Sequence, residues 1–102
     1  MSEQLSDSAE VIDNTGESRF ELCQDGWLAE LVYRLRGHRL VLVHTGVPSA
    51  LEGRGIGGRL VTAAIDRAVR EGLILVPLCP FARGWLERHP EAAARAVIDW
   101  DS

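Results

Sequence analysis

The strongest chemical signal in this sequence is a glycine-dense loop at residues 52–58, which reads Glu-Gly-Arg-Gly-Ile-Gly-Gly. Glycines carry no Cβ, so their backbone N–H groups can turn toward a common point and approach a ligand closely. The first amides of a following helix have no partner inside it, and the helix dipole favours an anion there. Arg54 and Arg59 flank these amides with positive charge. The loop predicts a phosphate or diphosphate site, with a ligand-free glycine-rich connector as the alternative.

Two familiar phosphate motifs do not fit this loop. Gly53, Gly55 and Gly58 have the spacing of the dinucleotide fingerprint, but that motif needs an acidic residue at the end of the next strand. Here that strand ends in Leu78 and Cys79. A P-loop needs Lys and then Ser or Thr after its last glycine, and this chain has Arg and Leu. Both motifs also belong to parallel sheets, whereas the strands before this loop are predicted to form hairpins.

Three strands are predicted before the loop. Polar and apolar residues alternate over residues 19–23 and 27–36, which is typical of half-buried strands. Asp25-Gly26 and Gly37-His38 are predicted to be the tight turns that follow them. Residues 39–45 are apolar on both faces in the middle of the segment, which predicts a strand at the centre of the sheet, partly covered by helices.

Helices alternate with one further strand after the loop. The apolar residues between Leu60 and Val69 recur at helical spacing, and Gly72 suits a left-handed C-cap. A short buried strand is predicted at residues 73–78, followed by a second helix from Pro80 to Arg88 that ends at His89-Pro90. Residues 91–97 predict one or two further helical turns.

The composition limits the partners and the kinds of site that this chain can have. The chain has 102 residues, 11 basic residues that are all Arg, 15 acidic residues and a net charge of −4. This balance disfavours a nucleic-acid partner, and no apolar run is long enough to cross a membrane. Two distant cysteines fit neither a disulfide framework nor a metal site. We expect a flexible acidic arm at residues 1–15 and one domain at residues 16–102, in the cytoplasm because no signal peptide is visible.

Three motifs together carry a family resemblance. They are the strand end His44-Thr45-x-Val47-Pro48, the loop at residues 52–57, and Pro77-x-Cys79-Pro80-Phe81 with Trp85 and His89-Pro90-Glu91 behind it. With these motifs the sequence resembles small acyl-CoA N-acyltransferases of the GNAT superfamily, in particular the minimal single-domain branch. The resemblance covers roughly residues 18–91. Glu52 departs from the Gln or Arg of the wider superfamily but is familiar in the minimal branch.

The resemblance implies an α/β (α+β) fold: a mostly antiparallel sheet, a crossover helix after the glycine loop and a short second helix. In such proteins the strands on either side of the crossover helix splay apart and the pantetheine arm of coenzyme A lies between them. Pro77 suits that opening because it has no N–H to donate to a neighbouring strand. Acetyl-CoA is the implied co-substrate, with no metal. The implied coenzyme-binding residues are Thr45, Val47, Arg54, Gly55, Ile56, Gly57, Gly58, Cys79 and Phe81.

Acyl transfer from a thioester to an amine needs a neutral amine, a donor to the oxyanion and a proton for the thiolate. The amide near Val47 is the candidate oxyanion donor. The resemblance places Cys79 near the coenzyme sulfur, as proton donor or acyl carrier, with a small buried hydrophobe as the alternative. His44 is the candidate base, with a structural role or deprotonation by solvent as alternatives. Gly46 stands where many relatives have Glu.

The sequence thus predicts an acetyl-CoA-dependent N-acetyltransferase, with an acyl-CoA-binding regulatory module without turnover as the alternative. The amine acceptor, a small molecule or a protein, is not specified by the sequence. We expect a monomer or a weak homodimer.

Overall fold

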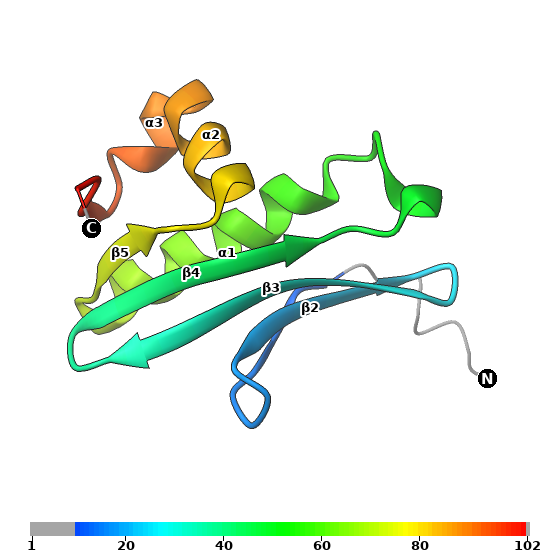
Figure 1. Ribbon diagram of the computed structural model, residues 1–102, viewed down its shortest axis with the longest axis horizontal. Helices are drawn as coiled ribbons and strands as arrows, with labels where there is room; N and C mark the ends of the chain where they lie inside the picture. The colour runs from blue at the N-terminus through cyan, green and yellow to red at the C-terminus, as the bar shows by residue number, and fades with distance from the viewer. Residues whose placement is uncertain (1–9, 102) are drawn as a thin grey trace.

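Within residues 10–101, which the computed structural model describes, six strands pair in chain order from β1 to β6. The pairings from β1 to β4 are antiparallel, and β4–β5 and β5–β6 are parallel (Figure 1). The strands are β1 (Ile12–Asn14), β2 (Arg19–Gln24), β3 (Trp27–Arg36), β4 (Arg39–Gly46), β5 (Ile74–Pro77) and β6 (Val97–Ile98). The helices are the short 3-10 helix Ser49–Leu51, α1 (Ile56–Glu71), α2 (Pro80–Arg88) and α3 (Pro90–Ala93).

The two predicted hairpin turns are present. Asp25 and Gly26 both have positive φ, 55° and 81°, which matches the twist of tight two-residue hairpins. In the two-residue turn between β3 and β4 only the first residue, Gly37, has positive φ, 61°, which is typical of the other common tight hairpin turn. The hairpins place β4 in the middle of the sheet, with β3 on one side and β5 on the other.

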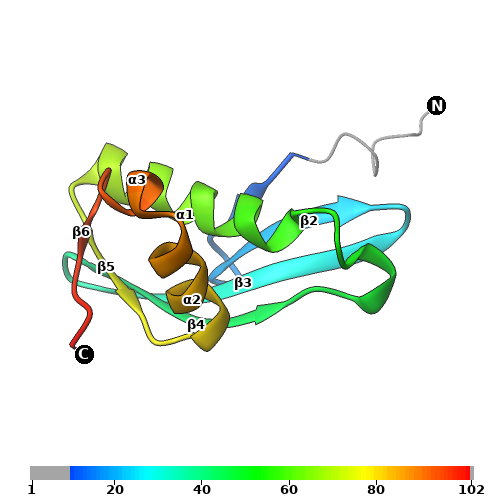
Figure 2. The same ribbon diagram turned by 90° about the horizontal axis from the view of Figure 1, so that it is seen from above.

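Helix α1 covers one face of the sheet. Its apolar stripe is buried and ends where Gly72 takes the predicted left-handed conformation at φ 67°. Helix α2 lies on the same side as α1 (Figure 2), and Ala82 and Leu86 of α2 join the same core. The core side of the sheet includes Leu40 and Leu75, which are fully buried neighbours on β4 and β5.

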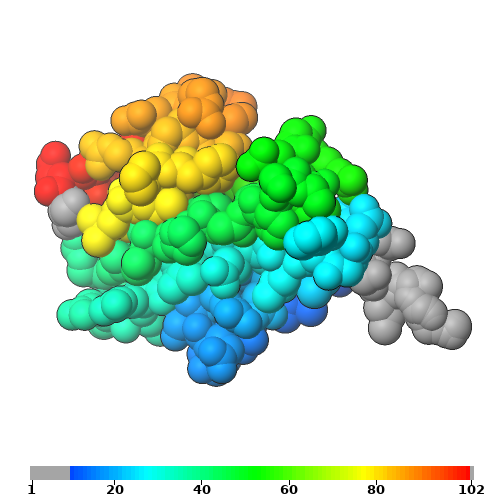
Figure 3. All heavy atoms as spheres, turned by 45° about the vertical axis from the view of Figure 1, so that its right-hand side comes forward, coloured from blue at the N-terminus to red at the C-terminus, as the bar shows by residue number. Residues whose placement is uncertain are grey.

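We call the opposite side of the sheet the open face; Arg34, Val41 and Val76 are neighbours on it, on β3, β4 and β5. In Figure 3 the strands from blue β2 through cyan β3 and green β4 to yellow β5 follow one another at the surface. The fold therefore has a helix-covered side and a strand-lined side, and the two sides offer different chemistry.

Strand β1 differs from the prediction of a flexible arm up to residue 15. Residues 1–9 lie outside the described residues, but Ile12–Asn14 pair with β2. Arg67 of α1, only 8% exposed, holds this strand: its Nη1 donates to Asp13 Oδ2 at 2.9 Å and to Tyr33 Oη at 2.8 Å. Tyr33 in turn donates to Asp13. Burial, and then the hydrogen bond to Asp13, raise the pKa of Tyr33 above its usual 10.0, which keeps the hydroxyl protonated.

We expect Arg67→Met to destabilise the fold by about 3 kcal/mol, because it leaves Asp13 and Tyr33 without their buried donor. Urea unfolding monitored by circular dichroism measures the loss. Arg70→Met is the matched control, since Arg70 lies one turn further along α1 with a side chain that is 62% exposed. Equal stability of the two variants would contradict a structural role for the Arg67 network.

Strand β6 was not predicted from the sequence. Val97 and Ile98 pair in parallel with Ile74 and Leu75, and Asp99 N–H donates to Leu75 O at 2.9 Å. No helix within residues 10–101 has both the length and the apolar character needed to cross a membrane.

Candidate active site

Strands β4 and β5 separate at one defined point, which we call the splay. Their pairing ends with Leu42 opposite Pro77. Immediately beyond, the amides of Leu78 and Cys79 both donate to Leu42 O, at 3.1 and 2.9 Å. Beyond this point strand β4 pairs with β3 only, as far as Gly46. The register shifts on the way: Leu42 is opposite Tyr33 and His44 is opposite Val32, which leaves Val43 as one extra residue in β4. The predicted end of pairing at Pro77 is therefore present, and no strand of residues 10–101 pairs with the β5 side of β4 beyond Leu42.

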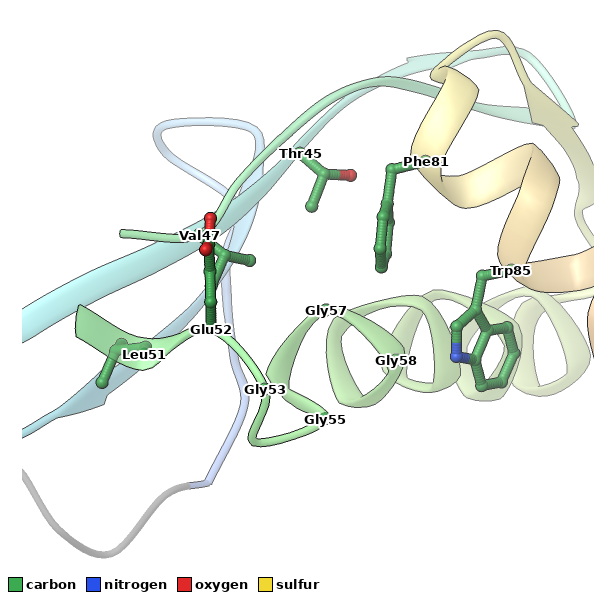
Figure 4. Close-up of a pocket in the computed structure, with 10 residues that line it drawn as sticks. All are labelled: Thr45, Val47, Leu51, Glu52, Gly53, Gly55, Gly57, Gly58, Phe81 and Trp85. Atoms are coloured by element: carbon green, nitrogen blue, oxygen red, sulfur yellow. The ribbon is translucent and has the colours of Figure 1, made fainter. Parts of the chain in front are cut away.

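A cavity of about 410 Å³ lies on the helix side of the splay (Figure 4). Its walls come from the end of β4, the 3-10 helix, the glycine loop, the first turn of α1 and the exposed side of α2. The residues that line it are Thr45, Val47, Leu51, Glu52, Gly53, Gly55, Gly57, Gly58, Phe81 and Trp85.

The glycine loop presents the start of α1 to this cavity. Gly55 is the N-cap of α1 in the left-handed conformation, at φ 74°, and it has no side chain with which to cap the helix. The first backbone bond of the helix runs from Arg59 N–H to Gly55 O. The three preceding amides, of Ile56, Gly57 and Gly58, have no partner within the helix. Apart from the chain neighbours of Gly55, no atom of residues 10–101 lies within 4 Å of where a Cβ on Gly55 would be, so the space beside these amides is open.

Gly57 and Gly58 have a further role that their spacing in the sequence does not reveal. A Cβ on Gly57 would lie 2.4 Å from Phe81 Cζ, and one on Gly58 would lie 2.5 Å from Trp85 Nε1. The missing side chains let both aromatic rings of α2 pack directly on the first turn of α1. Trp85 stacks on His89 with ring centroids 4.0 Å apart, which fixes the indole at the end of the wall.

Cys79 and Thr45 meet across the splay. Cys79 is the N-cap residue of α2 and is only 3% exposed. Its Sγ lies 3.1 Å from Thr45 Oγ1, so the thiol and hydroxyl are hydrogen-bonded at the inner end of the opening. Thr45 pairs with Leu31, a core residue, which places this contact on the helix side of the sheet.

His44 does not lie beside Cys79. It pairs with Val32 and is exposed on the open face. Gly46, two residues further on, is paired with Glu30 of β3. The point where a Cβ on Gly46 would be lies 3.5 Å from His44 Nε2 and 3.6 Å from Glu30 Oε2. The structure thus places a carboxylate from the neighbouring strand beside the glycine, and no motif in the sequence pointed to this residue. Glu30 also pairs with Arg19 at 3.2 Å.

Six of the predicted coenzyme-binding residues line the cavity: Thr45, Val47, Gly55, Gly57, Gly58 and Phe81. Ile56 is buried in the core, so it can offer its amide but not its side chain. Arg54 points elsewhere and forms an exposed ion pair of 2.8 Å with Asp25 in the β2–β3 turn. Glu52 and Gly53 of the predicted loop also line the cavity, although they were not among the implied coenzyme-binding residues, and Leu51 lines it without having been predicted. The two free cysteines of the described residues are the buried Cys79 and the exposed Cys23.

Possible metal ligands do not cluster in the part of the chain that the structure describes. Among residues 10–101 no three His, Cys, Asp or Glu side chains come together as ligands.

Residues 19–95 match a protein family described as GCN5-related N-acetyl-transferase. The chain belongs to the GCN5-related N-acetyltransferase family. The matched segment runs from β2 through α3 and so contains the splay, the glycine loop and both walls of the cavity. The resemblance stated from the sequence motifs is thereby confirmed.

Named relatives and a solved structure agree with this assignment. Protein NATD1 of Gallus gallus and of Homo sapiens are each 38% identical to the chain over 73 residues. These alignments cover 71% of this chain but only 64% and 63% of the relatives, so the chain spans less than two thirds of their length. The solution NMR structure of a GCN5-like protein from Staphylococcus aureus superposes with a TM-score of 0.69 at 28% identity. That match covers 91% of this chain and 92% of the other, and it confirms the predicted GNAT fold class.

Proposed function

We propose that this GCN5-related N-acetyltransferase domain transfers an acetyl group from acetyl-CoA to an amine. One observation carries the proposal: the amide-rich start of α1 and the unpaired side of β4 open into the same cavity. An anion-binding helix terminus and a strand edge are the two surfaces that a coenzyme with a diphosphate and an amide-containing arm requires.

The loop residues hold one end of the co-substrate. The amides of Ile56, Gly57 and Gly58 would donate to the diphosphate, assisted by the positive end of the α1 dipole. The peptide groups of β4 beyond Leu42 would pair with the pantetheine amides as β5 pairs with β4 before the splay. Phe81 and Trp85 would cover the arm, because their rings form the opposite wall.

The reacting groups meet at the splay. The amide near Val47 would donate to the oxygen of the thioester carbonyl as negative charge develops on it. The amine nitrogen attacks the carbonyl carbon, the C–N bond forms and the C–S bond breaks. Cys79 would give its thiol proton to the departing thiolate and regain one through Thr45 or from solvent. The ammonium group loses one proton before the attack, to His44 or to water on the open face. The nitrogen loses a second proton as the amide forms, to solvent, which balances the proton given to the thiolate.

Two measurements test the proposal. Calorimetric titration with acetyl-CoA is expected to show binding, and a thiol assay is expected to show coenzyme A release that depends on an added amine. Binding without release on any amine would favour the alternative of an acyl-CoA-binding regulatory module. Two observations favour this alternative: Gly46 itself carries no carboxylate, and Cys79 is deeply buried. No binding would refute both.

Asp25→Asn is expected to strengthen acetyl-CoA binding by about 2–5-fold at low salt, and less at high salt. The substitution removes a carboxylate from beside the anion site and releases Arg54 from its ion pair. The same calorimetric titration measures the change. Asp66→Asn is the control, because Asp66 forms a comparable exposed pair with Arg95, outside the cavity lining. Weaker binding in Asp25→Asn would mean that the pair orders the loop rather than competing with the ligand.

A further inference from the structure

The open face carries a second cavity, of about 330 Å³, beside the splay. Arg34 and Arg36 of β3 and Arg39 of β4 line it. Its apolar floor is formed by three valines and Leu78. Leu78 is 52% exposed, although it directly follows the buried strand β5. A cationic rim over an apolar floor is a pattern for binding a molecule with one anionic group and an apolar part.

The protein balances only one of the three positive charges of this cavity. Arg36 and Arg39 are direct cross-strand partners, an arrangement of like charges that destabilises a sheet. Asp99 neutralises Arg39 through an ion pair. Within the described range, 10–101, no acidic side chain pairs with Arg34 or Arg36. Two guanidinium groups therefore face the cavity with their forked donors available, and this geometry suits a carboxylate or a phosphate.

The position of the cavity connects it to the reaction. Val43 of β4 and Leu78, which directly follows β5, lie at one end of the floor and are the first residues beyond the last β4–β5 pair. Leu78 is the chain neighbour of Cys79, and Val43 precedes Thr45 by two residues, so this end of the floor is adjacent to the Thr45–Cys79 contact on the helix side. Arg34 is paired with Val41, two residues before Val43, so the cationic rim begins roughly 7 Å from Val43 at the rise of a strand.

We propose that this cavity binds the acceptor, and that the acceptor is an amine carrying an anionic group, held by Arg34 and Arg36, several ångströms from its nitrogen. The inference rests on the proposed acetyl transfer and names its substrate class. The apolar floor would contact the chain between the two charged ends.

The other end of the open face has the opposite charge. Glu30 Oε2 and His44 Nε2 both lie within 3.6 Å of the vacant side-chain position of Gly46. A carboxylate there attracts the ammonium group before it loses its proton, and His44 is exposed to receive that proton. Arg19 pairs with both Glu30 and Glu21, so two carboxylates face one guanidinium and this end keeps a net negative charge. The face is thus negative where the amine would react and positive where the anion would bind, which matches a zwitterionic acceptor and opposes a diamine.

Four acceptors of equal chain length test the substrate class in the acetyl-CoA-dependent thiol assay. They are 6-aminohexanoate, 6-aminohexyl phosphate, hexylamine and 1,6-diaminohexane. We expect kcat/KM for the better of the two anionic amines to exceed that for hexylamine at least ~10-fold, and the diamine to be the poorest. The two anionic compounds distinguish a carboxylate from a phosphate. Equal rates for all four, or a preference for the diamine, would overturn the proposal while leaving the acetyl transfer intact.

Variants locate the anion. Arg34→Gln and Arg36→Gln are each expected to reduce the preference for the anionic amine over hexylamine about 10-fold, with acetyl-CoA affinity unchanged. Arg88→Gln, at an exposed arginine on α2, is the matched control and is expected to keep the preference. An unchanged preference in both β3 variants would place the anion elsewhere and overturn the proposal.

A binding readout separates this proposal from the proposed function. NMR titration of the coenzyme A complex with 6-aminohexanoate and 6-aminohexyl phosphate is expected to shift the amides of Arg34, Val41 and Leu78, whether or not turnover occurs. Shifts without turnover would retain the acceptor site and reject the activity. Turnover without such shifts would retain the activity and reject the acceptor site. A dimer detected by sedimentation, with Arg34, Val41 and Leu78 at its interface, would also reject the acceptor site.

Discussion

Gly55→Val is expected to raise the dissociation constant for acetyl-CoA at least ~100-fold. Gly55 has φ 74°, a conformation that a β-branched residue adopts only under strain. The space around its absent Cβ is empty, so the new methyl groups would extend into the approach to the α1 amides. Whether the loop keeps its shape and is blocked, or relaxes and turns its amides away, the diphosphate loses its donors. Calorimetric titration measures the loss.

The matched control lies at the other end of the same helix. Gly72 caps α1 at φ 67°, and it too has nothing within 4 Å of the point where a Cβ would be, but it is not part of the cavity lining. Gly72→Val should therefore destabilise the protein by a similar amount, roughly 2 kcal/mol, from the same backbone strain. Its affinity for acetyl-CoA should be that of the unchanged protein once it is folded. Unimpaired binding in Gly55→Val would refute the anion site.

The sequence alone was sufficient to predict the elements that depend on local patterns. Alternation over residues 19–23 and 27–36, the Asp25-Gly26 turn and the Gly72 cap each depend on neighbours along the chain, and each is present in the structure. The same is true of Pro77, whose missing N–H marks the last pair of β4 and β5. These local signals, together with the three motifs, determined the fold class.

Contacts between distant segments could not be predicted in this way. Strand β1 depends on Arg67, which comes 54 residues after Asp13 in the chain and belongs, by its spacing, to the polar side of α1. The close approach of Phe81 to Gly57 needs the angle between two helices, which no pattern in one chain specifies. For this reason the sequence predicted only a ligand-binding role or a connector for the loop. In the structure two of its glycines also make room for aromatic rings of α2.

The register of β3 against β4 has the largest effect on where the predicted catalytic residues lie. One extra residue in β4 decides which side chains beyond Leu42 face the helices and which face outward. It directs Thr45 toward Cys79 and His44 toward the open face. A sequence pattern with period two cannot locate such a shift, so the sequence did not specify that the two predicted catalytic residues, His44 and Cys79, lie on opposite sides of the sheet. This separation suits a reaction in which the thioester and the amine approach from opposite sides.

Cys79→Ala is expected to lower kcat about 100-fold, equivalent to about 2.7 kcal/mol of transition-state stabilisation, with acetyl-CoA affinity unchanged. The thiol lies at the inner end of the splay behind Thr45, which lines the cavity, and its contact with the Thr45 hydroxyl orients it. Steady-state kinetics with a saturating amine measures kcat, and calorimetry measures affinity. Cys23→Ala, at the exposed cysteine of β2, is the control and should leave both values unchanged.

Two further observations distinguish the possible roles of the Cys79 thiol. Thr45→Val should lower kcat by a smaller factor, roughly 3–10-fold, because it removes the hydrogen bond that orients the thiol but leaves the thiol itself. Incubation with acetyl-CoA in the absence of an amine, followed by mass spectrometry, should find no acetyl group on Cys79 if the thiol is a proton donor, and a stable thioester if it is an acyl carrier. If Cys79→Ala turned over at the original rate, the residue would be a packing group, and the proton for the leaving thiolate would have to come from Thr45 or from water in the cavity.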